Sequence, residues 1–212
     1  MSISDLYEKA REPNFYFDSH FNIDAVKILP GEYYATVRPM LIVTVLGSCV
    51  AACIRDKVSG IGGMNHFMLP SISDLGEPTQ TTSAQYGTYA MEALINQLLE
   101  MGAERENLEA KIFGGGNLIN SFTVAKVGER NVKFVRSYLK KEHIPIVAED
   151  LLDIYPRKIY FFPDQDTVRM KKLIRLHNDT IIQREQEHDK RMCDAGSRYF
   201  CESLFWASQP NQ

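Results

Sequence analysis

The sequence lacks the features that would direct it to a membrane, a secretory route or a nucleic acid. No apolar run approaches the roughly 20 residues that a membrane-spanning helix needs. The first 18 residues carry Asp5, Glu8 and Glu12 in place of the basic start and apolar stretch of a signal peptide. The net charge of -3 gives no general attraction to nucleic acid or to an anionic membrane. We therefore expect a cytoplasmic protein with no nucleic-acid partner and no direct membrane insertion.

Motifs for metals and cofactors are also missing. Of the four cysteines, only Cys49 and Cys53 are closely spaced, and His66 is the only third ligand near them. A zinc site would need paired cysteines or histidines at short spacings. The glycines at 114–116 follow a predicted strand, but no Gly-Lys-Ser/Thr and no G-x-G-x-x-G accompanies them, which argues against a nucleotide. We expect no metal and no cofactor.

The pattern of apolar residues predicts short strands interrupted by two helices. Hydrophobic residues make up 44% and charged residues 24% of the 212 positions, as in ordinary globular proteins. The predicted helices cover 84–101 and 129–142, and the predicted strands cover 33–37, 41–46, 50–55, 61–69, 110–113, 144–148 and 158–162. This order predicts an α/β (α+β) sandwich with helices packed on a mixed β-sheet.

The two ends differ from the middle in composition. Residues 1–25 form a polar, aromatic-rich N-terminal lead-in, and the catalytic domain is expected over 26–172. The segment 165–192 is highly charged and helix-prone, which predicts an appended C-terminal helix. We expect residues 173–212 to form a helical extension and tail whose contacts the sequence does not identify.

A predicted β-hairpin brings a thiol toward an imidazole. A symmetric turn over residues 56–59 would make paired positions add up to 115. Cys49 then lies opposite His66, and Cys53 lies opposite Gly62. Opposed side chains on one face of a sheet have Cβ atoms about 4.5–5.5 Å apart. A slip of one residue would place the two side chains on opposite faces.

Such a pair can perform nucleophilic catalysis. A free thiol has a pKa near 8.5, and a neighbouring imidazole can take its proton to give the reactive thiolate. The flexible Gly47-Ser48 step would let backbone N–H groups converge on a developing oxyanion. Thr44 is the nearest hydroxyl that could orient the base.

Structural alternatives remain open for each candidate. A cysteine in a strand usually packs in the core, which is our expectation for Cys53, and His66 alone would fit a structural histidine. The loop containing Gly114 and Gly115 either allows close backbone approach beside the site or is a tight turn. Asn131 is expected to be a surface cap.

Several segments together resemble the CheD family of bacterial chemotaxis, the chemoreceptor glutamine deamidases. The most specific are the GSC of TVLGSCVAACIRD, the NHF of GIGGMNHFMLP and the FGGGN of AKIFGGGN. The remaining matches are VKILPGEYY (26–34), YGTYAMEALIN (86–96), VGERN (127–131) and PRKIYFFP (156–163).

The resemblance implies hydrolysis of glutamine, and sometimes asparagine, side chains in the cytoplasmic part of chemoreceptors (methyl-accepting chemotaxis proteins). It makes Cys49 the nucleophile, His66 the base and Thr44 the third member of the site. The implied fold is a three-layer α/β sandwich, similar to that of the catalytic domain of cytotoxic necrotizing factor. In some relatives a CheC-type phosphatase is a partner, so a non-catalytic interaction module is the alternative function. A protease using the same dyad is a third possibility.

Two positions depart from the family pattern. Gln85 stands where many relatives carry arginine, and residues 164–167 replace a turn that usually contains glycine. Neither touches the proposed nucleophile or base, so we expect activity to be kept and receptor preference to differ.

Overall fold

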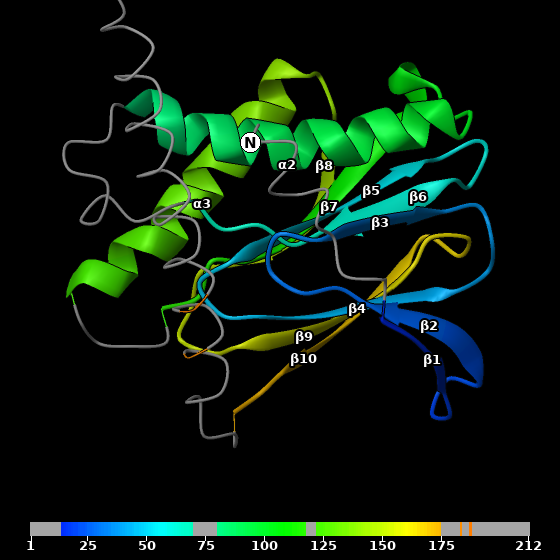
Figure 1. Ribbon diagram of the computed structural model, residues 1–212, viewed down its shortest axis with the longest axis horizontal. Coiled ribbons are helices and arrows are strands. Elements are labelled where there is room, and N and C mark those ends of the chain that lie inside the picture. Colours follow the sequence, from blue (N-terminus) through cyan, green and yellow to red (C-terminus); the bar gives the residue numbers. More distant parts are fainter. Residues whose placement is uncertain (1–13, 70–79, 118–121, 175–182, 184–186, 188–212) are drawn as a thin grey trace, which may run out of the picture.

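The computed structural model describes residues 14–69, 80–117, 122–174, 183 and 187, which form three stacked layers (Figure 1). One layer consists of helices and the other two are five-stranded mixed sheets. The middle sheet contains, in spatial order, β3 (Tyr33–Thr36), β6 (Gly62–Asn65), β5 (Val50–Asp56), β7 (Leu108–Gly114) and β8 (Ile146–Leu151). The outer sheet contains β1 (Asn14–Asp18), β2 (Ile23–Lys27), β4 (Leu41–Leu46), β9 (Arg157–Phe162) and β10 (Thr167–Lys172). The predicted three-layer sandwich is confirmed, with two sheets where the sequence indicated one.

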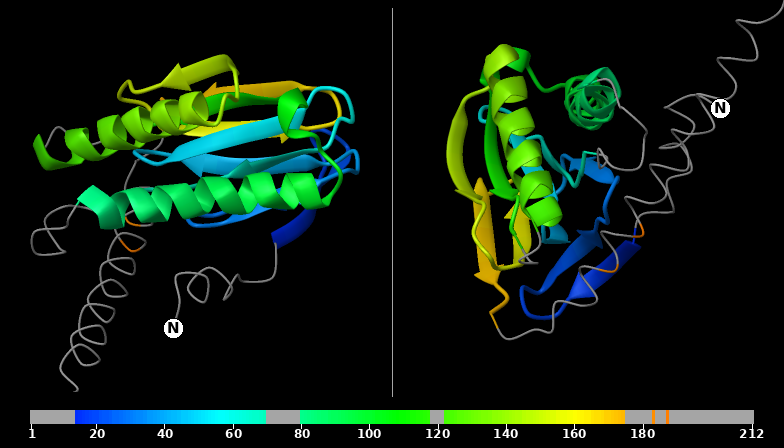
Figure 2. Two further views of the ribbon diagram at one scale, coloured as in Figure 1. Left: turned by 90° about the horizontal axis from the view of Figure 1, so that it is seen from above. Right: turned by 90° about the vertical axis from the view of Figure 1, so that its left-hand side faces the viewer.

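The helices α2 (Gln80–Glu100) and α3 (Phe122–Lys141) lie side by side over the middle sheet (Figure 2). The predicted apolar stripe of α2 is confirmed, because Met91, Leu94, Ile95 and Leu98 are all buried. Gly102 follows α2 with a φ of 101°, the left-handed conformation that commonly ends a helix. A short 3-10 helix, η2 (Arg105–Asn107), leads into β7. No helix in the described part of the chain is long and apolar enough to cross a membrane.

The strand β5 contributes to two separate cores. From Val50 to Ile54, the even-numbered side chains pack between the helices and the middle sheet. Cys49, Ala51 and Cys53 pack between the two sheets. Burial on both faces explains why this strand is almost continuously apolar, since successive side chains point to opposite faces.

The register of the hairpin between β5 and β6 differs from the predicted one by two residues. Cys53 pairs with Met64 instead of Gly62, so paired positions add up to 117, and a further bridge continues the same register beyond β6. The prediction that Cys49 lies directly opposite His66 is therefore wrong. Because side chains alternate with a period of two, a shift of two residues preserves the face of every side chain. Cys49 and His66 thus share the face toward the outer sheet, one diagonal step apart.

The turn explains the shift. Asp56 accepts hydrogen bonds on its carboxylate from the N–H groups of Val58 and Ser59, at 2.7 Å and 2.9 Å. Its own N–H donates to the Ile61 carbonyl, which closes a longer turn than the predicted one. Burial opposes ionisation of Asp56, but the hydrogen bonds from Glu104, Ser59 and Val58 prevail and lower the pKa of the carboxyl below its usual value.

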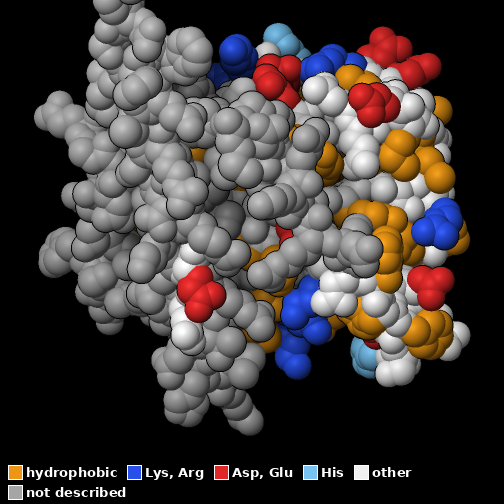
Figure 3. Space-filling model, in the orientation of Figure 1, with side chains coloured by type: hydrophobic (Ala, Val, Ile, Leu, Met, Phe, Trp, Pro, Cys, Tyr) orange, Lys and Arg blue, Asp and Glu red, His pale blue; other side chains and the backbone are white. Residues whose placement is uncertain are grey.

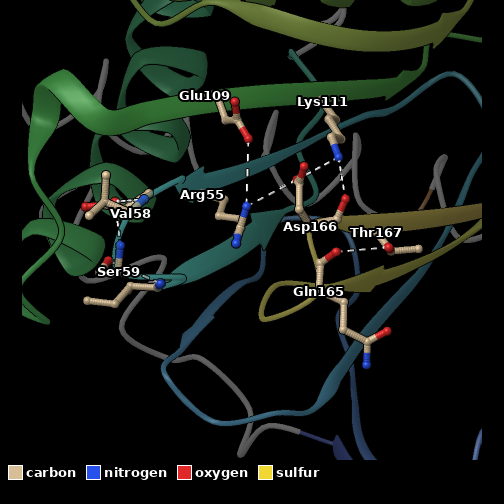
Figure 4. A network of polar contacts seen from close by, with 10 residues as sticks. Arg55, Val58, Ser59, Glu109, Lys111, Gln165, Asp166 and Thr167 are labelled. Atoms are coloured by element: carbon tan, nitrogen blue, oxygen red, sulfur yellow. Dashed lines mark hydrogen bonds and ion pairs between the residues drawn. The ribbon is translucent and has the colours of Figure 1, made fainter.

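A polar network joins the two sheets at the turn between β9 and β10 (Figure 4). Lys111 donates from Nζ to Oδ1 of Asp166 at 2.7 Å and to its carbonyl at 2.6 Å, and Arg55 lies 3.7 Å from the same carboxylate. Asp166 has a φ of 50°, a left-handed conformation that glycine adopts freely and aspartate tolerates. The aspartate therefore fits a turn where relatives are expected to have glycine, and its carboxylate adds a contact between the sheets.

Three strands are absent from the sequence prediction. β1 and the first part of β2 lie in the segment that we expected to be a lead-in, and β10 lies where the charged segment predicts a helix. In β10, Val168 and Met170 contact the core between the sheets while Arg169 and Lys171 point outward, a period-two pattern that the high charge obscures. The helix prediction is therefore wrong for 167–172. Beyond residue 174, nearly all of the predicted appended helix lies outside the described residues.

Candidate active site

A hydrogen bond between the two sheets joins the predicted base to the predicted orienting hydroxyl. Thr44 lies on β4, and its Oγ1 is 2.8 Å from Nδ1 of His66, which directly follows β6. The same Oγ1 is 2.8 Å from the carbonyl oxygen of Ile28. Thr44 is 0% and His66 is 2% exposed, so both contacts are shielded from water.

The Ile28 contact decides which ring nitrogen of His66 carries a hydrogen. A hydroxyl donates one proton and a carbonyl can only accept, so Thr44 donates to Ile28 and accepts from Nδ1 of the imidazole. Nδ1 therefore carries the hydrogen, and Nε2 keeps its lone pair on the other side of the ring. An imidazole held in this form can act as a base at Nε2.

The turn after β2 holds the backbone of His66. Gly31 donates its N–H to the His66 carbonyl at 2.7 Å, and the His66 N–H donates to the Glu32 carbonyl at 2.9 Å. Gly31 has a φ of 86°, which glycine adopts without strain. The sequence indicates a turn at Pro30 and Gly31 but contains no signal for this contact, because it joins segments far apart in the chain.

Cys49 lies in the tight turn between β4 and β5, and the glycine loop after β7 holds this turn in place. Gly115 donates its N–H to the Cys49 carbonyl, and Gly116 donates its N–H to the Gly47 carbonyl, both at 2.7 Å. Gly114 and Gly115 have φ values of 112° and 67°. A Cβ at Gly114 would collide with the Cys49 carbonyl, so glycine is required there.

These contacts position the turn that carries the thiol. The N–H of Gly115 is directed at Cys49 itself, and the loop supports the backbone on both sides of Ser48. The oxyanion and substrate-loop roles expected for Gly47, Ser48, Gly114 and Gly115 stay predictions.

Asn131 on α3 connects the two halves of the site. Its Oδ1 accepts a hydrogen bond from the Leu69 N–H, and its Nδ2 donates to the Ser48 carbonyl, both at 2.9 Å. The side chain is completely buried, so the expectation of a surface cap is wrong. Gly128, one helical turn earlier, lets α3 approach the Gly115 backbone closely. The spacing of Gly and Asn in VGERN is the sequence signal that could have revealed this contact.

Replacing Asn131 by leucine is expected to lower kcat at constant KM and to destabilise the fold. Each buried group left without its partner costs about 1–3 kcal/mol. The loss of kcat follows because the Cys49 turn is no longer held against the strand that carries His66. Thermal unfolding and the kinetics of ammonia release measure the two effects.

Asn96→Leu is the matched control, because Asn96 is exposed on α2 and its replacement should change neither quantity. A fall in stability with an unchanged kcat would show that Asn131 has only a structural role.

Thr44→Val is expected to reduce kcat by about 100-fold, the order of effect of misplacing a reacting group by about 1 Å. Valine has the shape of threonine but removes the acceptor of the His66 Nδ1 hydrogen, so neither the tautomer nor the ring orientation is fixed. Thr44→Ser keeps the hydroxyl and should restore most of kcat. Equal activity of the two variants, measured by ammonia release, would show that the hydroxyl has no part in catalysis.

The second cysteine of the hairpin behaves as a core residue. Cys53 is 2% exposed, and burial strongly raises the pKa of its thiol, while Lys111 acts in the opposite direction. The thiol therefore stays protonated and packs as a small hydrophobic group, which confirms the expectation for Cys53. Cys49 is also fully buried, but it lies on the turn between two strands, one diagonal step from His66 on the same face.

The fold and the site define a class of protein. Thiol-dependent hydrolases combine a thiol with an imidazole whose second nitrogen is fixed by another group. Here Cys49 and His66 lie on one face of the hairpin, one diagonal step apart, and Thr44 fixes the second nitrogen of His66. The family model described as "CheD chemotactic sensory transduction" matches residues 68–172.

Curated relatives extend the match over nearly the whole chain. A protein of Methylobacillus flagellatus is 62% identical over 187 residues, which cover 87% of this chain and 92% of the relative. A protein of Thiobacillus denitrificans is 60% identical over 191 residues, covering 90% and 94%. Both are named "Probable chemoreceptor glutamine deamidase CheD". The chain belongs to the CheD family.

Among solved structures, the Bacillus licheniformis hypothetical protein YfiH matches with a TM-score of 0.40 and 12% identity. The match covers 58% of this chain and 51% of that one, and we draw no argument from it.

Proposed function

We propose that this chain is a protein-glutamine deamidase that hydrolyses side-chain amides in the cytoplasmic domain of a chemoreceptor. In this proposal Cys49 is the nucleophile, His66 the base and Thr44 the group that orients the base. The observation that carries it is the buried hydrogen bond between Thr44 and Nδ1 of His66. Because Nδ1 points to Thr44, the basic nitrogen Nε2 points away from Thr44, on the face of the hairpin that His66 shares with the thiol of Cys49. The names of the relatives supply the substrate class, and the cytoplasm is the compartment in which that receptor domain would be met.

The proposed reaction has two halves. First, Nε2 of His66 takes the thiol proton of Cys49, and the thiolate attacks the side-chain carbonyl carbon of a glutamine. The imidazolium then gives its proton to the departing nitrogen, the C–N bond breaks, and ammonia leaves a thioester on the enzyme. In the second half a water molecule loses a proton to His66 and attacks the thioester carbonyl carbon, the C–S bond breaks, and His66 returns the proton to the departing thiolate. The products are glutamate and the original thiol, so each turnover consumes one water and releases one ammonia.

Substrate access has a structural requirement. Because Cys49 is fully buried, a glutamine side chain can contact its sulfur only after neighbouring chain moves aside. We expect iodoacetamide to react with Cys49 slowly in the isolated protein and faster in the presence of a receptor fragment. A dry site also strengthens the electrostatic interactions that stabilise the developing oxyanion.

The proposal is tested by mass spectrometry of a receptor cytoplasmic fragment incubated with and without this protein. Conversion of an amide to an acid changes the mass of the peptide that contains it, so the assay reports both activity and position. Ammonia release in proportion to converted sites is the expected result. Cleavage of the fragment backbone would instead indicate a protease.

One observation favours a second candidate, the interaction module that binds a receptor or a CheC-type phosphatase. The edge strand β1 exposes Phe15 and Phe17, which are 53% and 59% accessible, beside an open pocket of about 620 Å³ also lined by Arg38 and Met40. Figure 3 shows hydrophobic side chains gathered on the right-hand side of the molecule, where β1 and β2 lie in Figure 1. Partner binding that survives Cys49→Ala, without ammonia from any receptor peptide, would favour this candidate.

A further inference from the structure

The outward face of the outer sheet carries a group of cations. Lys158 lies on β9, and Arg169 and Lys171 lie on the neighbouring strand β10. They alternate with Ile159 and Met170, which contact the core between the sheets, so the cations point to the other side. The helices α2 and α3 cover the middle sheet (Figure 1). On this face of the outer sheet, Ala25, Leu41, Val43 and Phe162 are buried in a small cluster with Phe21, whereas Arg169 and Lys171 on β10 are exposed.

These cations differ from many others on the molecule in their lack of acidic neighbours. Within the described residues, no carboxylate lies within ion-pair distance of Lys158, Arg169 or Lys171. Several other cations do pair with carboxylates, namely Arg55, Arg105, Lys111, Arg136, Arg157 and Lys172. Lys158 and Lys171 are direct partners in the β9–β10 register. Like charges directly opposite each other on a sheet repel, so this pair costs stability unless something neutralises it.

Aromatic rings hold two of the cations in place without neutralising them. The Lys158 Nζ lies 4.8 Å from the centre of the Tyr160 ring. The Arg169 guanidinium carbon lies 5.4 Å from the centre of the Phe21 ring and 6.0 Å from that of Phe162. A ring face attracts a cation but leaves its full charge available to a partner. The surface is therefore rigid as well as positive.

The cations lie near the candidate active site. Lys158 pairs with Val45 of β4, and Val45 precedes Cys49 by only four residues. Even a fully extended chain of that length spans at most about 14 Å. A receptor whose glutamine side chain reaches Cys49 would therefore also contact this end of the outer sheet.

We propose that Lys158, Arg169 and Lys171 form a docking surface for an acidic surface of the receptor whose glutamines are deamidated. The inference rests on the proposed function. The chain has a net charge of -3, so an acidic partner is repelled overall and needs a local region of opposite sign to bind. Each turnover turns a neutral amide into a carboxylate, so a receptor surface that has been modified at one site becomes more acidic and binds this face better.

The test compares two charge-reversed double variants. Lys158→Glu with Lys171→Glu changes the proposed surface, and Lys133→Glu with Lys140→Glu makes the same change in net charge at exposed positions of α3. Binding to a receptor cytoplasmic fragment is measured by titration at low and high salt, with Cys49→Ala added to each protein so that no reaction occurs. We expect the first double variant to bind about tenfold more weakly at low salt and to lose salt dependence, and the second to bind like the parent.

Kinetics provide a second readout with Cys49 intact. We expect the Lys158 and Lys171 double variant to have an increased KM for the fragment, a nearly unchanged kcat and an unchanged rate on a short uncharged glutamine peptide. Equal weakening of receptor binding by the two double variants would overturn the proposal. It would also be overturned if the Lys158 and Lys171 double variant bound the receptor fragment like the parent but lost binding to anionic lipid vesicles or to RNA. If the parent releases no ammonia but its receptor binding still depends on Lys158 and Lys171, the proposed function fails while the docking surface stands.

Discussion

Cys49→Ala is expected to lower the rate of receptor deamidation by at least about 10³-fold, because removal of the nucleophile leaves only binding and oxyanion stabilisation to act on the amide. The fold should persist, since alanine fits wherever the cysteine packs and Cys49 forms no disulfide. Ammonia release and the mass of receptor peptides measure the effect. His66→Ala should reduce the rate in the same direction, because the thiol then lacks its proton acceptor.

Cys53→Ala is a stringent control for this prediction. Cys53 lies on β5, which begins directly after Cys49, and it faces the same core and is also buried. Its replacement should leave kcat within about twofold and lower stability by about 1 kcal/mol, the cost of removing one buried heavy atom. If the Cys53 variant loses activity and the Cys49 variant keeps it, the assignment of the nucleophile is wrong.

Arg157→Met is expected to lower the free energy of unfolding by about 3 kcal/mol, the upper end of what a hydrogen bond to a charged group contributes. Arg157 is 0% exposed and donates to the Asp150 carboxylate and to the carbonyls of Tyr155 and Leu152. Methionine has a similar length but leaves all three acceptors without this donor. For a domain of this size, the expected fall in melting temperature is about 10 °C, measured by calorimetry.

Arg136→Met is the matched comparison. Arg136 pairs with Glu149, the neighbour of Asp150 on β8, but both side chains are nearly half exposed. Surface pairs of this kind contribute about 1 kcal/mol or less, so its melting temperature should stay close to that of the parent. Similar losses in the two variants would show that burial does not distinguish the two ion pairs.

Arg157 also supports the active site from a distance. It holds the segment after β8, in which Leu152 and Asp153 both have left-handed φ values. That segment donates a hydrogen bond from Leu152 to the Gly114 carbonyl, and Asn117 donates to the Asp153 carbonyl. We therefore expect the Arg157 variant to lose some activity even at temperatures where it is fully folded.

The hairpin shows how a wrong pairing can still place two residues correctly on one face of a sheet. The predicted register is displaced by two residues, because the carboxylate of Asp56 organises a longer turn than the count of polar residues suggests. Had the displacement been one residue, Cys49 and His66 would lie on opposite faces. Because side chains alternate between the two faces, the two-residue error in the register left Cys49 and His66 on the same face.

Other features depended on contacts between distant segments. The Ile28 carbonyl that fixes the hydrogen of His66, and the Asn131 side chain that links Ser48 to Leu69, have no local sequence pattern of their own. The strand β10 was misjudged because its outward side is charged enough to resemble a solvated helix.

By itself, the sequence determined the alternation of strands and helices, the sandwich of helices on a sheet and the grouping of Cys49, His66 and Thr44 as candidates. These follow from hydrophobic periodicity, turn residues and local spacing, which act over a few neighbouring residues. Only the tertiary structure decided the pairing register, the second sheet, the tautomer of His66 and the burial of Asn131 and Arg157. The second sheet, the tautomer of His66 and the burial of Asn131 depend on groups far apart in the chain, which meet only when the sheets and the helices pack together. The register and the contacts of Arg157 involve residues close in sequence, but they depend on hydrogen bonds of Asp56 and Asp150 that the hydrophobic pattern does not predict.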